Sequence, residues 1–319
     1  MDDHQHAGRN EGATGPIALT GASGFVGRAV VEALRRQGSR ILALGNPASA
    51  PELEGVDWVP VNLLDPPTVK ATLAHHKPCA LIHAAWARSE GAGLWNLEAN
   101  WAWRDASAAL LRAFWEETGG HVVACGTCAE YSPPPEGDCI EDVTPIAPAS
   151  TYGKAKAELA DRARKDAQAL GGSIAWARLF YLFGKHEAPS RLVPQVIDRL
   201  LAGGIAEIGS GRAVRDFGYV SDIGAGLVAL LNSGESGTFN VATGSGVSIA
   251  SLVDRIGHAL GKSDRIALGT LPDRPDEPPR IVADITRLKE TTGWSPAFDV
   301  ASGLSETINW RKRKGPATG

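Results

Sequence analysis

The chain has 319 residues, a length that fits one large domain or two modest ones. Its formal net charge of −4 gives no indication of a nucleic-acid partner. The composition, with 43% hydrophobic and 21% charged residues, is typical of a globular protein. No apolar stretch approaches the roughly 20 residues of a membrane span, so a membrane partner is not expected either.

Both ends of the chain are polar. Residues 1–15 have no apolar core, so we interpret them as a disordered tail and not as a secretory signal. Residues 313–319 are expected to form a second tail. Without a signal peptide the expected location is the cytoplasm, where the thiols should be free. The four cysteines are Cys79, Cys125, Cys128 and Cys139.

The first predicted element is a buried strand over residues 17–19, followed by a glycine turn and a helix over 28–36. The turn contains Gly21, Gly24 and Gly27. In such a turn the first glycine allows the sharp bend, the second lets a diphosphate approach the backbone, and the third lets the helix lie close to the strand. The alternative is a glycine turn that binds nothing. The strand before it and the helix after it favour a dinucleotide site.

Strands and helices then alternate as far as residue 179. This alternation predicts an α/β fold with a doubly wound parallel sheet, the Rossmann arrangement. The expected strands are residues 40–44, 58–61, 79–82, 121–125 and 173–179, and the expected helices are 69–75, 94–118 and 151–170.

The alternation stops after residue 179, and the rest predicts a smaller C-terminal substrate-binding lid. We expect residues 16–180 to form the dinucleotide-binding domain, with 217–243 returning to it. The lid domain then comprises 181–216 and 244–312. The recognisable elements of the lid are helices over 247–260 and 300–310 and an irregular loop over 272–279, and the segment that returns to the first domain contains a strand over 238–241.

Tyr152 and Lys156 lie one turn apart on one face of a predicted helix. An ammonium beside a phenol favours the phenolate, so we expect Lys156 to lower the pKa of Tyr152 from ~10 toward neutrality. Such a tyrosine can exchange a proton with a carbinol or carbonyl while a nicotinamide exchanges a hydride. The pair alone occurs by chance on many helices, but together with the glycine turn it is a strong signal.

Cys125-Gly-Thr-Cys128 has the spacing of a redox motif, which is an alternative to a catalytic role for this stretch. No second Cys or His pair nearby completes a zinc site, and we predict no metal. We interpret the stretch as the end of a strand.

With these residues the chain resembles the extended short-chain dehydrogenase/reductase family, the group of NAD-dependent epimerases and dehydratases. The resemblance extends from Ile17 to about Trp310. It rests on Gly21-Ala-Ser-Gly24-Phe-Val-Gly27, His83-Ala-Ala85, Tyr152-Gly-Lys-Ala-Lys156, Arg178-Leu-Phe-Tyr-Leu-Phe-Gly184, Arg215-Asp-Phe-Gly-Tyr-Val-Ser-Asp222 and Gly293-Trp-Ser-Pro-Ala-Phe298.

The resemblance implies a set of site residues. Thr127 joins Tyr152 and Lys156 as the third catalytic residue and orients the reacting oxygen. The implied cofactor contacts are Gly21, Ser23, Gly24, Phe25, Val26, Gly27, Asn46, Asn62, Leu63, Ala84, Ala85, Tyr152 and Lys156. The implied substrate contacts are Trp86, Thr127, Tyr181, Arg191, Arg215 and Arg274.

Arg215 occupies the position that the family commonly uses to bind the diphosphate of the substrate. The alternative is a salt bridge within the lid, to Asp216 or Asp222. The resemblance also implies a homodimer built on helices 94–118 and 151–170. We expect the tryptophans of the first helix to serve the core or this subunit interface.

The second strand ends in Leu44-Gly45-Asn46-Pro47, without the acid that usually binds the ribose hydroxyls of NAD. It also lacks an arginine for a 2′-phosphate, so the cofactor is NADP(H) or NAD(H), with NADP(H) slightly favoured.

The resemblance implies a sugar-nucleotide oxidoreductase acting at C4, and we expect reduction of a 4-keto sugar nucleotide. A 4-epimerase is the alternative. Dehydration is less favoured because Cys128 and Ala129 stand where 4,6-dehydratases carry acids, with Glu130 one place later. A non-catalytic NADP-binding redox sensor is the alternative of another class, although the chain keeps Tyr152 and Lys156. Arg215 argues against a neutral ketone or aldehyde as substrate.

Overall fold

The computed structural model describes residues 15–46, 53–87, 91–132, 134, 136–273 and 277–314. Its larger part is a seven-stranded sheet in the order β10-β6-β5-β4-β1-β2-β3, in which every neighbouring pair is parallel. The strands are β1 (Ile17–Thr20), β2 (Ile41–Gly45), β3 (Asp57–Pro60), β4 (Ala80–His83), β5 (His121–Thr127), β6 (Ser173–Leu179) and β10 (Gly237–Val241).

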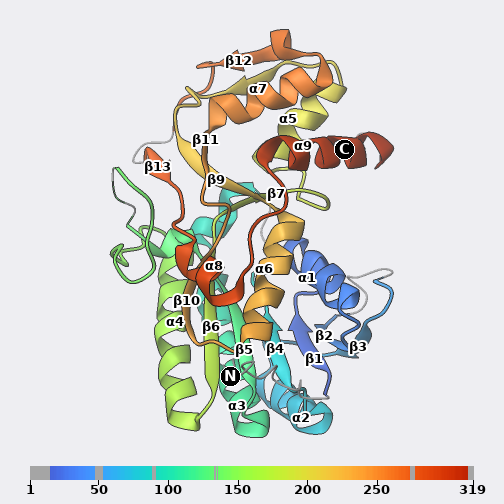
Figure 1. Cartoon of the computed structure of the whole chain (residues 1–319), viewed down its shortest axis with the longest axis vertical. Helices are drawn as coiled ribbons and strands as arrows, with labels where there is room; N and C mark the ends of the chain where they lie inside the picture. The colour runs from blue at the N-terminus through green and yellow to red at the C-terminus, as the bar shows by residue number, and fades with distance from the viewer. Residues whose placement is uncertain are drawn as a thin grey trace, which may run out of the picture.

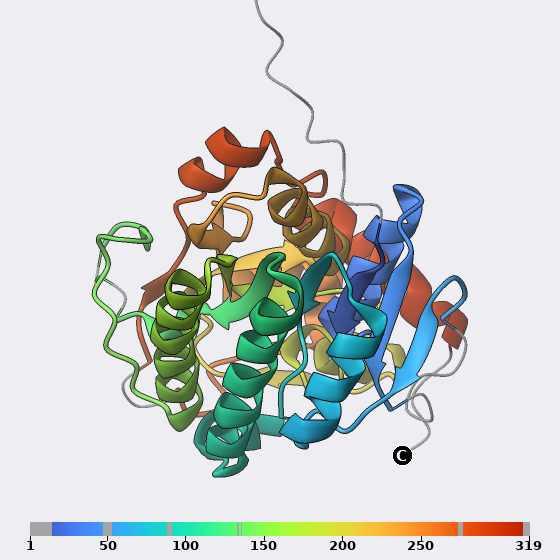
Figure 2. The same ribbon diagram turned by 90° about the horizontal axis from the view of Figure 1, so that it is seen from below.

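Helices cover both faces of this sheet (Figures 1 and 2). One face packs against α2 (Pro66–His76), α3 (Ala99–Thr118) and α4 (Thr151–Leu170), and the other against α1 (Phe25–Arg36) and α6 (Val220–Ser233). Neighbouring residues of a strand point to opposite faces, so Ala18 joins the first layer and Leu19 the second. Burial on both faces explains why the strands are continuously apolar. The predicted doubly wound sheet is confirmed.

The C-terminal part forms a smaller body beyond the carboxyl ends of the strands (Figure 1). A four-stranded sheet contains β7 (Tyr181–Phe183), β9 (Val214–Tyr219), β11 (Gly246–Ser248) and β13 (Arg280–Ile281). A two-stranded sheet pairs β8 (Ala206–Ile208) with β12 (Ile266–Leu268). Three helices, α5 (Leu192–Leu201), α7 (Ile249–Leu260) and α9 (Val300–Lys314), share a separate apolar core with β7, β8 and β9. The short helix α8 (Thr286–Thr292) packs instead against the larger body, where Leu288 joins the core beneath α6.

One predicted helix is shorter than expected. The segment 94–118 was expected to be continuous, but α3 begins at Ala99 and a 3-10 helix, η2 (Gly91–Asn96), precedes it. The buried Asn100 side chain donates to the Leu94 carbonyl at 2.8 Å, so a side chain satisfies the acceptor that a helix would use. The chain therefore turns at this point.

The described residues contain no helix that is both long and apolar enough to cross a membrane. Residues 1–14 and 315–319, which include most of both predicted tails, lie outside the described part of the chain. The boundaries of the two domains stay a prediction, although β10 and α6 lie in the larger body.

Candidate active site

The turn between β1 and α1 has a backbone conformation and close contacts that only glycine can accommodate. Gly21 has a φ of +74°, which favours glycine, and a Cβ at Gly27 would lie 1.9 Å from the Gly21 carbonyl oxygen. At Gly24 a Cβ would meet only that oxygen, at 3.1 Å. Gly24 is also the N-cap of α1, and no side chain caps the helix. The first N–H groups of α1 are therefore available to an anion.

A buried histidine holds the ends of β1 and β4 together beside this turn. His83 Nδ1 lies 2.8 Å from the Thr20 hydroxyl and its Nε2 lies 2.9 Å from the Ser107 hydroxyl. Burial, assisted by the charge of Lys156, lowers the pKa of His83 to about 3, so the ring is neutral. The Thr20 hydroxyl also accepts the Ala85 N–H at 3.3 Å, which places the Ala84-Ala85 segment against the glycine turn.

Tyr152 and Thr127 meet at the carboxyl end of the sheet. Thr127 ends β5, and Tyr152 lies in the first turn of α4, which the Ser150 hydroxyl caps by accepting the Gly153 N–H at 3.1 Å. A Cβ at Gly153 would lie 2.3 Å from the Ala129 carbonyl oxygen, so α4 begins directly against the end of β5. Thr127 lies close enough to Tyr152 to lower the pKa of its phenol, against the larger effect of burial.

Lys156 is buried beneath this pair and does not lower the Tyr152 pKa as expected. Its Nζ donates to the Cys125 carbonyl at 2.8 Å and lies 3.6 Å from the centroid of the Trp86 ring. Burial lowers the pKa of Lys156 to about 8. Burial also raises the pKa of Tyr152 above its usual value, and the effect of Thr127 offsets only part of this. The expected phenolate is therefore wrong for this structure, in which the phenol keeps its proton.

Two tryptophans flank the phenol. The rings of Trp86 and Trp95 lie edge-to-face with Tyr152, at centroid distances of 6.2 and 5.8 Å. Trp86 is fixed by its Nε1, which donates to Asn100 at 2.8 Å. The sequence analysis missed Trp95 because it assigned this residue to a continuous helix. It lies instead in η2, which the turn at Asn100 directs toward the site.

Arg215 lies on β9 with 1% of its side chain exposed. It donates to Glu277 and to the Val214 carbonyl, both at 2.8 Å. The predicted alternative partners were wrong. Asp216 accepts from the backbone N–H groups of residues 243 and 244, and Asp222 accepts from that of residue 298. The sequence analysis missed Glu277, because the sequence of an irregular loop does not indicate which of its side chains faces Arg215.

The Arg215 Nε is buried without a hydrogen-bond partner among the described residues. Its guanidinium lies 5.4 Å from the centroid of the Tyr181 ring. Cys128 lies close enough to both Tyr181 and Tyr152 to affect the pKa values of the two phenols, so Arg215 and Tyr152 lie in the same region of the molecule.

The thiols at the end of β5 are not a redox pair. Burial raises the pKa of Cys125 to about 11 and that of Cys128 to about 12, so both stay protonated at neutral pH. All the cysteines, which lie in the described part of the chain, are free. Within that part, no group of three His, Cys, Asp or Glu residues could hold a metal ion.

Some of the other predicted contact residues lie at the glycine turn or at strand ends, and others do not. Ser23, Phe25 and Val26 belong to the turn and to the start of α1. Asn46 follows β2, and Asn62, which accepts the Leu64 N–H at 3.1 Å, follows β3 together with Leu63. Arg191 is exposed at the start of α5, and its charge acts on Glu187. Arg274 lies outside the described residues.

Comparison with known proteins identifies the family. The model of the NAD dependent epimerase/dehydratase family matches residues 17–242. The chain belongs to this family.

Among the relatives of this chain, a dTDP-glucose 4,6-dehydratase from Xanthomonas campestris pv. campestris is 28% identical over 324 residues, covering 92% of each chain. A dTDP-4-dehydro-6-deoxy-D-allose reductase from Streptomyces bikiniensis is 27% identical, covering 92% of this chain and 95% of that one. The structure of a UDP-glucose 4-epimerase from Thermus thermophilus in complex with NAD has a TM-score of 0.83 at 24% identity, covering 92% and 98%. Because the three names denote three reactions, these similarities leave the reaction of this chain open.

A dinucleotide fits the residues of this family member. The uncapped start of α1 offers N–H groups to a diphosphate, and the space above Gly24 would be filled by a side chain at that position. The Lys156 ammonium adds a positive charge beside Tyr152. Hydrogen-bond donors for a diphosphate and a cation near the nicotinamide end are the groups that a nicotinamide dinucleotide requires.

Proposed function

We propose that this protein is an NAD(P)-dependent sugar-nucleotide oxidoreductase that reduces the keto group of a 4-keto sugar nucleotide. The observation that carries the proposal is the placement of Tyr152 beside Thr127 at the carboxyl end of β5, where burial raises the pKa of the phenol and makes it a proton donor. Reduction of a carbonyl needs a proton donor at the oxygen that gains charge. A 4-epimerase would use the same tyrosine first as a base and then as an acid, so the choice of the reductase rests on the cofactor argument given below.

The residues of the site divide into those that hold the cofactor and those that act on the substrate. The glycine turn and the start of α1 would hold the diphosphate, with Lys156 at the nicotinamide ribose. When bound, the cofactor supplies the hydride for the carbonyl carbon. Tyr152 gives its proton to the carbonyl oxygen, and Thr127 donates a hydrogen bond to the same oxygen.

The surroundings of Thr127 argue against dehydration. Cys128 and Ala129 follow it and carry no carboxylate. Glu130 is completely buried and binds Arg178, Trp176 and the Thr127 N–H. Its carboxylate is therefore committed to the interior and is not available to remove a proton from a sugar.

Arg215 supports a nucleotide substrate. Its Nε is a buried donor without a partner among the residues that the structure describes, and such a group is costly unless a ligand satisfies it. A diphosphate is the ligand that a guanidinium binds best. Because Cys128 affects the pKa values of both Tyr152 and Tyr181, and Tyr181 lies beside Arg215, we infer that one molecule with a sugar ring and a diphosphate reaches both residues.

We further propose NADPH as the reductant. β2 ends at Gly45, and no acid follows before Glu52. A carboxylate at this position would repel a 2′-phosphate, so its absence removes the main obstacle to NADPH.

The test is a panel of sugar nucleotides, with and without a 4-keto group, offered with NADH and with NADPH. We expect consumption of NADPH with the 4-keto compounds alone. A protein that binds the cofactor and consumes it with no member of the panel would be a redox sensor instead, and the proposal would fail.

We also propose a homodimer formed through α3 and α4. These helices are tied to each other by ion pairs, Arg104 to Glu158 at 2.5 Å and Arg112 to Asp166 at 3.1 Å, which leaves a rigid outer surface. Trp115, however, is 3% exposed and belongs to the core. Light scattering at micromolar concentration tests the dimer, and a monomer would rule it out.

A further inference from the structure

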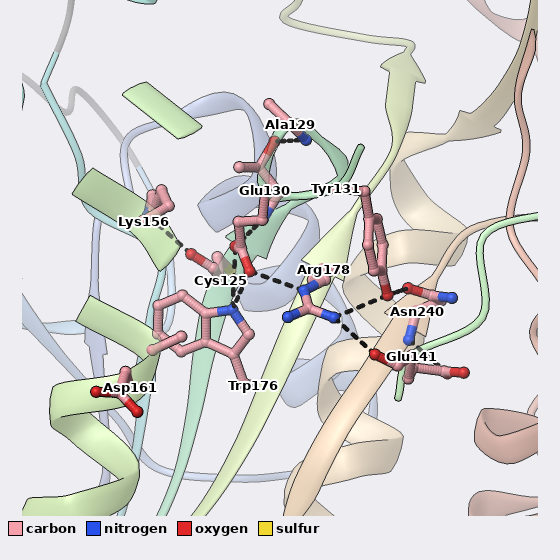
Figure 3. Close-up of polar contacts among 12 residues, drawn as sticks. Cys125, Ala129, Glu130, Tyr131, Glu141, Lys156, Asp161, Trp176, Arg178 and Asn240 are labelled. Atoms are coloured by element: carbon pink, nitrogen blue, oxygen red, sulfur yellow. Dashed lines mark hydrogen bonds and ion pairs between the residues drawn. The ribbon is translucent and has the colours of Figure 1, made fainter. Parts of the chain in front are cut away.

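Glu130 is completely buried. Figure 3 shows its carboxylate directed toward Trp176 and Arg178. Its Oε1 accepts the Thr127 backbone N–H at 2.8 Å. Both oxygens lie 3.1 Å from the Trp176 indole Nε1, and Oε2 accepts from Arg178 Nε at 2.7 Å. Every part of this charged group therefore has a partner, as a buried charge requires.

These partners determine the path of the backbone at the end of β5. A Cβ at Gly126 would lie 2.3 Å from the Trp176 Nε1 and 2.7 Å from Glu130 Oε1. The backbone of residue 126 is therefore in direct contact with both side chains. On the preceding residue, the Cys125 carbonyl accepts from Lys156. The three residues up to Thr127 are each held by a different buried group.

The same contacts orient the Thr127 hydroxyl. Its oxygen accepts the Ala129 N–H at 3.2 Å while Glu130 accepts the Thr127 N–H, which is a reciprocal capping box around a single turn. Because the oxygen already accepts inside the turn, the hydroxyl is left to donate its proton to a group outside the turn. Tyr152 is a neighbour on that side, since Thr127 lowers the pKa of its phenol.

Arg178 connects Glu130 to the rest of the sheet (Figure 3). Its Nη1 donates to the Tyr131 hydroxyl at 2.8 Å and to the Glu141 carbonyl at 3.2 Å. The Tyr131 hydroxyl donates in turn to Asn240 on β10 at 2.8 Å. The position of Glu130 is thus fixed from two neighbouring strands, β6 and β10, and not by its own turn alone.

We propose that Glu130 is a positioning residue, held by Arg178 and Trp176, that fixes the Thr127 backbone and aims the Thr127 hydroxyl at the reacting oxygen. This role rests on the proposed function, because it assigns a task to the same site. Glu130 moves no proton in the reaction. It contributes by keeping Thr127 in the geometry in which its hydrogen bond to the carbonyl oxygen is already oriented.

The test compares Glu130→Gln with Glu141→Gln. Glu141 is a matched control, because its carboxylate is also buried and also accepts a backbone N–H, that of Asn240 at 2.9 Å, without contacting Thr127. For Glu130→Gln we expect kcat to fall by roughly ten- to a hundred-fold at nearly unchanged KM, as misplacement of a catalytic group does. Glu141→Gln should keep the kcat of the wild type.

A second measurement does not depend on activity or on the folding of any variant. In the wild-type protein labelled at threonine, the Thr127 amide proton should resonate downfield of ordinary amides, because it donates to a carboxylate. Glu130→Gln should move this resonance upfield and Glu141→Gln should not. An ordinary Thr127 resonance in the wild type, or equal kcat values for the two variants, would overturn the role of Glu130. Absence of turnover in the wild type with a downfield Thr127 resonance would instead count against the proposed reaction alone.

Discussion

The Lys156 ammonium donates a hydrogen bond to the Cys125 carbonyl at 2.8 Å instead of approaching the Tyr152 hydroxyl. The contacts of this ammonium are that carbonyl and the face of the Trp86 ring. They do not fully compensate for its burial. Burial lowers the pKa of Lys156 to about 8, within the range in which enzymes are assayed.

We expect kcat/KM to fall as the pH rises through about 8, because the free enzyme then loses the Lys156 ammonium that is proposed to hold the nicotinamide ribose. The protonated form dominates below this pH, so activity is retained on the acidic side. A profile of kcat/KM against pH measures the descending limb. Lys156→Arg should lower the rate and remove this limb, because arginine stays charged. A wild-type profile that is flat across this range would refute the assignment.

Tyr152→Phe is expected to lower kcat by ~10²–10⁴ and to leave cofactor affinity nearly unchanged, because it removes only the proton donor. Single-turnover rates and cofactor fluorescence titrations measure the two quantities. Tyr219→Phe is the control, since Tyr219 is 4% exposed and packs with Phe183 and Phe298 in the smaller body. Wild-type turnover by Tyr152→Phe would remove Tyr152 from the mechanism.

Arg215→Ala is expected to raise KM for the sugar nucleotide strongly, by an amount equivalent to ~2–5 kcal/mol, and KM for the cofactor little. Arg280→Ala on the adjacent strand β13 is the control, because Arg280 pairs with Asp138 at 2.5 Å and is partly exposed. Steady-state kinetics with each substrate varied in turn distinguishes the two effects. If cofactor affinity fell instead, Arg215 would belong to the cofactor site.

The neutral His83 predicts a loss of stability in acid. Its pKa lies near 3 in the folded protein and at the usual 6.5 in the unfolded chain, so the unfolded chain binds the extra proton between these values. The free energy of unfolding should therefore fall as the pH drops below 6.5, with a slope of up to about 1.4 kcal/mol per pH unit from this group. Urea unfolding at several pH values measures it. His83→Gln should flatten the dependence, whereas His258→Gln, at an exposed position, should not. Parallel curves for the wild type and His83→Gln would exclude this origin.

The larger sheet could be predicted because its signals are local. Strands that are buried on both faces have short, continuously apolar sequences. The glycine turn at Gly21 is recognised from the residues directly before and after it. Strands of the smaller body, such as β13 and β8, have two or three residues and form only by pairing with distant segments. No periodicity develops over such a length.

The candidate site likewise contains residues that local spacing predicts and residues that only the tertiary structure reveals. Thr127, Tyr152 and Lys156 were predicted from spacing, and the structure brings them to the end of β5. The contacts of Glu277 with Arg215 and of Trp95 with Tyr152 could not be predicted. They depend on the tertiary positions of a loop and of a 3-10 helix, which no local sequence pattern indicates. Glu130 was considered as an acid for the reaction, but whether a carboxylate faces a substrate or the interior depends on partners such as Arg178, which lies 48 residues later in the chain.

The central claim is that Tyr152 and Thr127 protonate and orient a carbonyl that is being reduced. The most direct measurement uses NADPH with deuterium in place of the transferred hydrogen, a 4-keto-6-deoxy sugar nucleotide and purified enzyme. We expect one NADPH to be consumed for each product molecule, and the product to carry deuterium at C4. Interconversion of two sugar nucleotides without net consumption of NADPH would contradict the reductase and establish an epimerase.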